Sequence, residues 1–108
     1  MNATDYNCWI KEDGTSNRVT SGLHLCNIEP DDCIRVSMPE RRRTWVGIDV
    51  YPNATPEAKT TCIHLIRSIR REGLQIRAHI DGTTIEVLPH QRPTTLNKAL
   101  ACIPSPSI

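Results

Sequence analysis

The stretch that decides the fold is residues 74–88, which read L-Q-I-R-A-H-I-D-G-T-T-I-E-V-L. The dipeptide Asp81-Gly82 is a strong signal for a two-residue hairpin turn, because the favoured turn needs positive φ at both central positions. The register of the two strands then follows outward from the turn. The predicted pairs are Ile80–Thr83, Ala78–Ile85 and Ile76–Val87 on one side, with His79–Thr84 and Arg77–Glu86 on the other. Apolar residues meet apolar residues and opposite charges meet, as cross-strand pairing prefers, so the sequence predicts a hairpin over 74–88.

The segment before this hairpin carries the signals of a helix over about 56–72. Thr55 is a good N-cap, Pro56 suits the first helical position, and Gly73 is placed to end the helix. Apolar residues recur on one face at helical spacing: Ala58, Cys62, Leu65, Ile66 and Ile69. This apolar face predicts that the helix packs against a sheet.

Two strands are predicted upstream of the helix. In 33–38 the apolar residues Ile34, Val36 and Met38 alternate with polar ones, and 44–51 alternates in the same way. Residues 39–43 would connect these strands as a hairpin loop. The strand 44–51, the helix and the strand 74–80 together suit one right-handed crossover unit.

The first third and the last residues of the chain give weaker patterns. A strand is expected over 6–10, a turn-rich loop over 11–17 and a returning strand over 18–21. A further extended piece is expected from the spacing of Leu23, Leu25 and Ile28, and 29–32 is expected to be a turn. Near the C-terminus, Thr94 or Thr95 could cap a short helix that carries Leu96, Ala99, Leu100 and Ile103.

These elements predict an α+β fold. We expect a mostly antiparallel sheet, one main helix on one face, the hairpin 74–88 and a short C-terminal helix. The length of 108 residues predicts a single domain over 1–108, with 104–108 as a frayed tail. A hydrophobic fraction of 38% and a charged fraction of 23% are typical of a globular chain rather than a disordered one.

Composition also bears on the compartment. No apolar run approaches the roughly 20 residues that span a bilayer, so no membrane association is predicted. The first residues lack the basic start and apolar stretch of a signal peptide. The five cysteines have irregular spacing, and we interpret them as reduced thiols in a cytoplasmic protein.

Candidate chemistry is scarce. His24 and Cys26 would share one face of a strand, with Cys33 and Cys8 as possible further ligands, but no C-x-x-C pair supports zinc, and no metal or other cofactor is predicted. No nucleophile elbow, phosphate-binding glycine loop or dinucleotide fingerprint occurs. Cys62 falls on the apolar helix face, which indicates core packing. The sequence therefore predicts that the protein is not an enzyme.

Charge is the feature that points to a partner. The net charge is only +1, but acidic residues concentrate in 1–40 and basic residues in 41–108. Such asymmetry indicates either an anion-binding half or two halves that attract each other within the fold. The candidate binding residues lie in the 39–43 connection, just after it, on the helix and on the hairpin: Arg41, Arg42, Arg43, Trp45, His64, Arg67, Arg70, Arg71, Arg77 and His79.

Residues 21–37, S-G-L-H-L-C-N-I-E-P-D-D-C-I-R-V-S, contain an Ile-x-Pro-x-Asp turn followed by an alternating strand. This stretch resembles the segment before the second strand of AbrB-type swapped-hairpin DNA-binding domains. Asp31 stands where that family usually has glycine, and no flanking motif extends the match. The resemblance implies DNA binding for that family, and no residue role is carried over from it.

Two classes of function stand against each other. The first is a small non-enzymatic protein that binds a protein partner through a basic loop and helix face, as an inhibitor or regulator of a bacterial or phage system would. The alternative is direct nucleic-acid binding through Arg41–Arg43 and the outer face of the main helix. A homodimer built through a sheet edge is a third reading.

Overall fold

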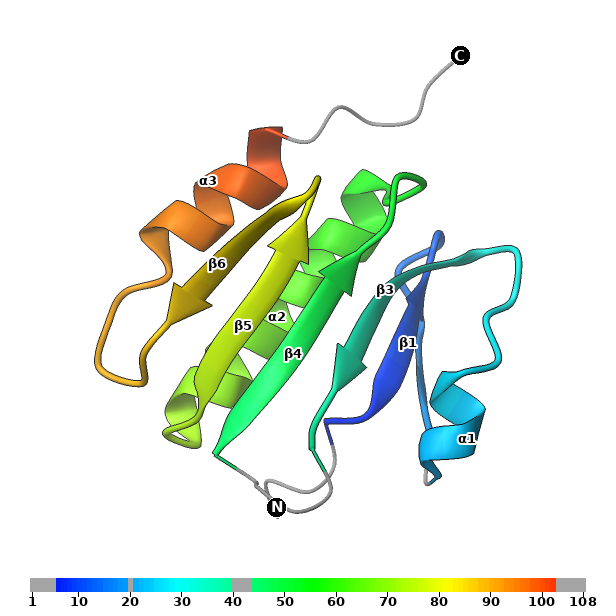
Figure 1. Ribbon diagram of the computed structural model, residues 1–108. Coiled ribbons are helices and arrows are strands. Elements are labelled where there is room, and N and C mark those ends of the chain that lie inside the picture. The colour runs from blue at the N-terminus through cyan, green and yellow to red at the C-terminus, as the bar shows by residue number, and fades with distance from the viewer. Residues whose placement is uncertain (1–5, 20, 40–43, 103–108) are drawn as a thin grey trace.

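A computed structural model describes residues 6–19, 21–39 and 44–102 of the chain. In this part, six strands form one sheet in the order β2-β1-β3-β4-β5-β6, and three helices accompany it (Figure 1). The strands are β1 (Cys8–Lys11), β2 (Ser16–Arg18), β3 (Asp32–Ser37), β4 (Trp45–Val50), β5 (Gln75–Ile80) and β6 (Thr83–Val87). The helices are α1 (Gly22–Leu25), α2 (Pro56–Arg71) and α3 (Thr94–Cys102).

The architecture confirms the predicted α+β class. Neighbouring strands are antiparallel except β4 and β5, which run parallel because α2 carries the chain back between them. Figure 1 shows α2 on one side of β4 and β5, with the other side of these strands turned to the viewer. The leucines Leu96 and Leu100 of α3 join the same core, so α3 packs on the face that α2 covers.

The hairpin that decides the fold has the predicted register. All five pairs occur, from Ile80–Thr83 at the turn to Ile76–Val87 at the far end. Asp81 and Gly82 adopt φ values of 50° and 76°, as the turn requires. Local turn chemistry and the alternation of side chains therefore agree, and each strand turns its apolar residues to the core.

The main helix begins and ends where its capping residues predict. The Thr55 side chain accepts a hydrogen bond from the Ala58 N–H, and Gly73 lies at φ 78° just beyond the helix. The buried face of α2 consists of Ala58, Lys59, Cys62, Ile66 and Ile69, whereas Leu65 is half-buried at its margin. This face packs on alternating strand residues, of which Ile34, Val36, Val46, Ile48, Ile76 and Ala78 are fully buried.

The predicted extended piece around Leu23 and Leu25 is wrong. Ser21 accepts a hydrogen bond from the Leu23 N–H, and α1 begins there as a short helix. Leu23 is 77% exposed and Ile28 is 54% exposed, so the apparent alternation does not reflect burial. Because Gly22–Leu25 is a helix and Cys26 caps its end, His24 and Cys26 do not lie on one face of a strand.

The first hairpin is tighter than the sequence predicts. The returning strand is β2, Ser16–Arg18, rather than 18–21, and β2 is exposed throughout. Asp13 accepts hydrogen bonds from the backbone N–H and the hydroxyl of Thr15, and Gly14 adopts φ 87°, so the chain reverses within a few residues. Residues 40–43 of the predicted loop and the predicted tail 104–108 lie outside the described residues.

Candidate binding surfaces

The first candidate surface lies on the face of the sheet opposite α2. Because strand side chains alternate, the residues between the core positions of β3 to β6 point to this face. We call the following residues the open sheet patch: Arg35, Trp45, Asp49, Arg77, His79 and Glu86. No helix overlies β4, β5 and β6 on this side in Figure 1, and all six side chains are half-buried or exposed.

The centre of the open sheet patch is a stacked pair. The guanidinium carbon of Arg77 lies 4.6 Å from the centre of the Trp45 ring. Gly47 makes room for this arrangement, because a Cβ at that position would come within 3.3 Å of the Trp45 ring. Arg77 Nε also lies 3.4 Å from Glu86 Oε1, as an ion pair whose geometry does not make a hydrogen bond. Arg77 is therefore positioned between a ring and a carboxylate.

A second row of polar side chains crosses the same face. Arg35 donates to Asp49 Oδ2 from Nη2 at 2.8 Å and from Nε at 3.0 Å. The hydrogen bonds to the Asp49 carboxylate raise the pKa of Arg35 above its ordinary value. His79 Nδ1 lies 3.0 Å from Thr84 Oγ1. Each arginine of the patch thus has a carboxylate partner, and the patch is close to neutral as a whole.

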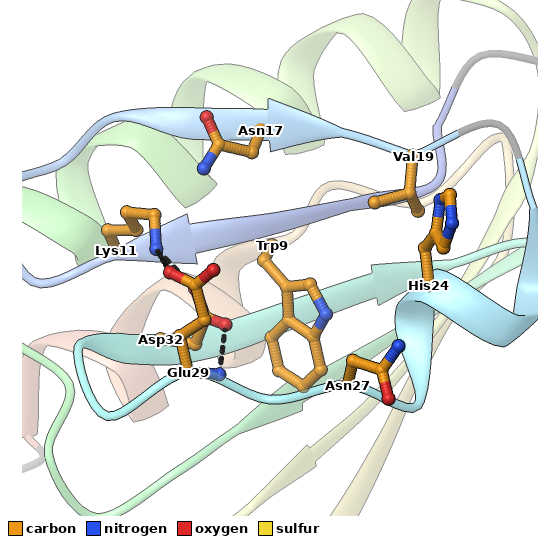
Figure 2. Close-up of a pocket in the computed structure, with 8 residues that line it drawn as sticks. All are labelled: Trp9, Lys11, Asn17, Val19, His24, Asn27, Glu29 and Asp32. Carbon is orange, nitrogen blue, oxygen red and sulfur yellow. Dashed lines mark hydrogen bonds and ion pairs between the residues drawn. The ribbon is translucent and has the colours of Figure 1, made fainter.

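Toward β1, α1 and the loop that follows it cover the same face of the sheet. Trp9 points to this face but is only 4% exposed, and its ring centre lies 5.9 Å from that of Tyr51. A pocket of about 230 Å³ lies around the Trp9 ring. Figure 2 shows Lys11 and Asp32 at one end of it and His24 and Asn27 at the other. Trp9 Nε1 is buried and has no hydrogen-bond partner among the described residues. The open part of this face therefore lies over β4, β5 and β6, with Arg35 of β3 next to it.

An ion cluster that the sequence did not predict holds the turn 29–32 against β1. Lys11 Nζ contacts Glu29 at 2.7 Å, Asp31 at 3.0 Å and Asp32 at 3.2 Å. These hydrogen bonds raise the pKa of Lys11 above its ordinary value. Asp32 Oδ2 also accepts a hydrogen bond from the Glu29 N–H at 2.8 Å (Figure 2). The turn 29–32 was predicted, but its lysine partner lies on another strand and gave no local signal.

The second candidate surface is the outer side of α2. His64, Arg67 and Arg71 are exposed there, while Arg70 is half-buried and donates from Nε to the Gln91 carbonyl at 3.0 Å. These four residues lie on the opposite side of the sheet from Trp45, Arg77 and His79. The structure therefore divides the predicted binding residues between two surfaces. Arg41, Arg42 and Arg43 lie outside the described residues.

The thiols bear on chemistry. Cys8, Cys33 and Cys62 are buried, and Cys26 and Cys102 are exposed. Burial raises the pKa of Cys62 to about 12 and that of Cys8 to about 11, so both are protonated at neutral pH. A protonated thiol is a weak nucleophile and a poor metal ligand. Within 6–19, 21–39 and 44–102, no three histidine, cysteine or acidic side chains gather as a metal site would need.

Comparison with protein-family models, with curated proteins and with solved structures finds no significant match to this chain. Among the described helices, none combines the length and the apolar character needed to cross a membrane.

Proposed function

We propose that this is a non-enzymatic protein that binds a protein partner through the open sheet patch. The observation that carries the proposal is the Trp45–Arg77 stack on the part of the sheet, over β4 to β6, that none of the described helices covers on this side. Tryptophan and arginine are enriched among the residues that dominate binding energy at protein interfaces. Here the two side chains are already held against each other, so Trp45 and Arg77 would lose little further side-chain entropy when a partner binds.

The charge of the patch supports a protein partner over a nucleic acid. Arg35 has Asp49 as its partner, and Arg77 has Glu86. Binding to a phosphate backbone depends on unneutralised cations that displace counterions, and a balanced patch supplies few of them. A protein surface with its own mixed charges can match such a patch, and the flanking ion pairs would set the orientation of the partner.

The proposed biological role is that of an inhibitor or regulator in the cytoplasm of a bacterial or phage system. A chain of 108 residues that acts by covering a partner's surface needs no catalytic set. The five cysteines are unpaired, which suits a reducing compartment. Disulfide formation in protein isolated under anaerobic conditions would contradict this placement.

The test is capture of a partner from nuclease-treated native lysate, with wild type and matched variants. Trp45→Ala and Arg77→Glu should each remove a band that wild type retains, because both take apart the central stack. Arg71→Glu makes the same charge change on the far side of the molecule and should retain the band. Light scattering on the purified chain shows separately whether β6, at one edge of the sheet, pairs two copies in a homodimer.

A specific observation also supports nucleic-acid binding as the second candidate. Arg67 and Arg71 are exposed four residues apart on α2, where their like charges repel by a few tenths of a kcal/mol. A phosphate backbone would relieve that repulsion and could also contact Arg41–Arg43. This candidate predicts a mobility shift that weakens steeply with salt and falls when Arg41, Arg42 and Arg43 are changed to Ala. An absence of binding to DNA and RNA at low salt would remove it.

A further inference from the structure

A pocket of about 340 Å³ lies between α2 and the start of α3, on the side of the sheet away from the open sheet patch. Three of its lining side chains are arginines, Arg67 and Arg70 from α2 and Arg92 from the loop before α3. We call it the arginine pocket. The rest of its lining consists of Ile63, Ile66, Pro93, Thr94 and Asn97. Among the residues that the structure describes, no carboxylate lines it, so the described walls give the pocket a positive charge that they do not neutralise.

The loop that brings Arg92 to this pocket is held in place by hydrogen bonds. Arg70 Nε donates to the Gln91 carbonyl at 3.0 Å, which ties the loop to α2. Gln91 closes the loop on itself, because its side-chain oxygen accepts from the Leu88 N–H at 3.1 Å and its own N–H donates to the Leu88 carbonyl at 3.0 Å. Arg70 therefore acts both as a pocket cation and as the anchor that sets Arg92 beside Arg67.

The other two arginines have no partner among the described residues. Within 6–19, 21–39 and 44–102, neither Arg67 nor Arg92 makes an ion pair or a side-chain hydrogen bond. Their guanidinium groups are exposed and each offers several donors. In the open sheet patch, by contrast, each arginine has a carboxylate. Cations gathered in one pocket without a counter-charge indicate a site for an external anion.

The start of α3 adds backbone donors to the same place. The first hydrogen bond of this helix runs from the Asn97 N–H to the Pro93 carbonyl at 2.8 Å. Pro93 has no side-chain acceptor, and no other described side chain caps the N–H groups of Thr94, Thr95 and Leu96. These groups are the positive end of the helix dipole, and Thr94 lines the pocket. Asn97 also lines the pocket, and its Oδ1 is buried with no hydrogen-bond partner among the described residues.

We propose that the arginine pocket binds a phosphate group, either as inorganic phosphate or as the terminal group of a phosphomonoester. A phosphate dianion matches several guanidinium donors and free helix N–H groups better than a carboxylate, because it offers more acceptor oxygens and more charge. The pocket is larger than one phosphate ion, and Ile63, Ile66 and Pro93 give the remaining space an apolar wall. That wall suits the organic part of a small monoester. The site is separate from the open sheet patch, so the two proposals can fail independently.

The test is an NMR titration of the isotopically labelled full chain at constant ionic strength. Inorganic phosphate, phenyl phosphate and sulfate are added in separate experiments, and the backbone amides and arginine Nε signals are followed. Phosphate should give saturable shifts centred on the amides of Thr94, Thr95 and Leu96. The double variant Arg67→Gln/Arg92→Gln should weaken the apparent affinity by about tenfold or more, because two charge-assisted hydrogen-bonding groups are lost.

A matched control separates a pocket from a general attraction of anions. Arg71→Gln removes one charge, as each substitution of the double variant does, but one turn further along α2 and outside the pocket, and it should leave the affinity for phosphate nearly unchanged. Phenyl phosphate that binds more tightly than phosphate would identify a monoester as the natural source, and equal affinities would identify the phosphate group alone.

The proposal would be overturned by shifts that do not saturate, by shifts spread evenly over the basic surface, or by a double variant that binds as tightly as wild type. Binding of an oligonucleotide without terminal phosphates, while phosphate itself fails to bind, would also overturn it and would favour a nucleic-acid track along α2. Because the double variant keeps Arg70 and its bond to Gln91, its amide spectrum should match that of wild type before ligand is added.

Discussion

The two faces of the sheet use the same strands for different purposes. On the face beneath α2, the residues of β4 and β5 are aliphatic, and most of them, such as Ile48 and Ile76, are fully buried. The next residue along each strand, Asp49 or Arg77, points to the opposite face and is polar and partly exposed. Asp49 pairs with Arg35, and Arg77 pairs with Glu86. A shift of one position along a strand therefore separates a residue that stabilises the fold from one that is available to a partner. The difference teaches that stability and binding should be separable by mutation.

The largest expected effect is on the covered face. Ile76→Ala should lower the free energy of unfolding by about 2–5 kcal/mol, because it leaves a cavity in a fully buried site beneath α2. Urea denaturation followed by circular dichroism measures this. A loss below about 1 kcal/mol would mean that the two faces do not differ as their burial indicates.

High pH should also lower the free energy of unfolding through the thiols buried on the covered face. The pKa of Cys62 is raised to about 12 and that of Cys8 to about 11, because burial disfavours the thiolate. Between pH 9 and 10 the unfolded thiols ionise while the folded ones keep their protons. The folded state then binds more protons, so stability falls as pH rises, by about 1.4 kcal/mol per pH unit for each thiol.

Urea denaturation at several pH values between 9 and 10 tests this slope. Cys62→Ala should make the slope shallower by one thiol's share, even though the variant is less stable overall. Unfolding energies that do not change across this window would contradict the assignment of these thiols to a dry core.

A smaller effect is expected at the N-terminal cap of α2, the helix that covers one face of the sheet. Thr55→Ala removes the acceptor for the Ala58 N–H and the hydroxyl that donates to the Glu12 carbonyl. The free energy of unfolding should fall by about 1 kcal/mol. Thr55→Ser, which keeps the hydroxyl, should recover most of the loss, and a Ser variant as unstable as the Ala variant would contradict a capping role.

The smallest effect on stability is expected on the open face. Arg77→Ala removes the stack on Trp45 and the contact with Glu86, both partly exposed, and should cost less than about 1 kcal/mol. Its neighbour Ile76 serves as the direct comparison in the same denaturation experiment. If Arg77→Ala destabilised as much as Ile76→Ala, the open sheet patch would be structural rather than a display surface.

Much of the fold could be predicted where local chemistry and alternation agree. The Asp81-Gly82 turn, the Thr55 cap and Gly73 each have a local cause, and the structure bears each of them out. The prediction of an extended piece over Leu23–Ile28 was wrong, because the apolar spacing matched a strand while Ser21 caps a short helix there. Nothing in the spacing of a segment shows that Leu23 is exposed, because burial depends on what packs over it.

The candidate site could be predicted only as a set of residue types. Arg77 and His79 were correctly placed on the polar side of the hairpin by alternation. Arg67 and Arg70 lie on the other side of the molecule because α2 covers the other face of the sheet. Local sequence patterns do not show which face a helix covers. Arg92 was missed because it meets Arg67 and Arg70 only through the fold, by way of the Gln91 contact.

The most direct test of the central claim compares three chains in one capture experiment from nuclease-treated lysate. These are wild type, Arg77→Glu on the open sheet patch and Arg71→Glu on the outer side of α2, all with their melting temperatures measured. We predict that wild type and Arg71→Glu retain the same protein band and that Arg77→Glu loses it without a matching loss of stability. A band that Arg77→Glu retains in full, or that Arg71→Glu loses instead, would contradict the account.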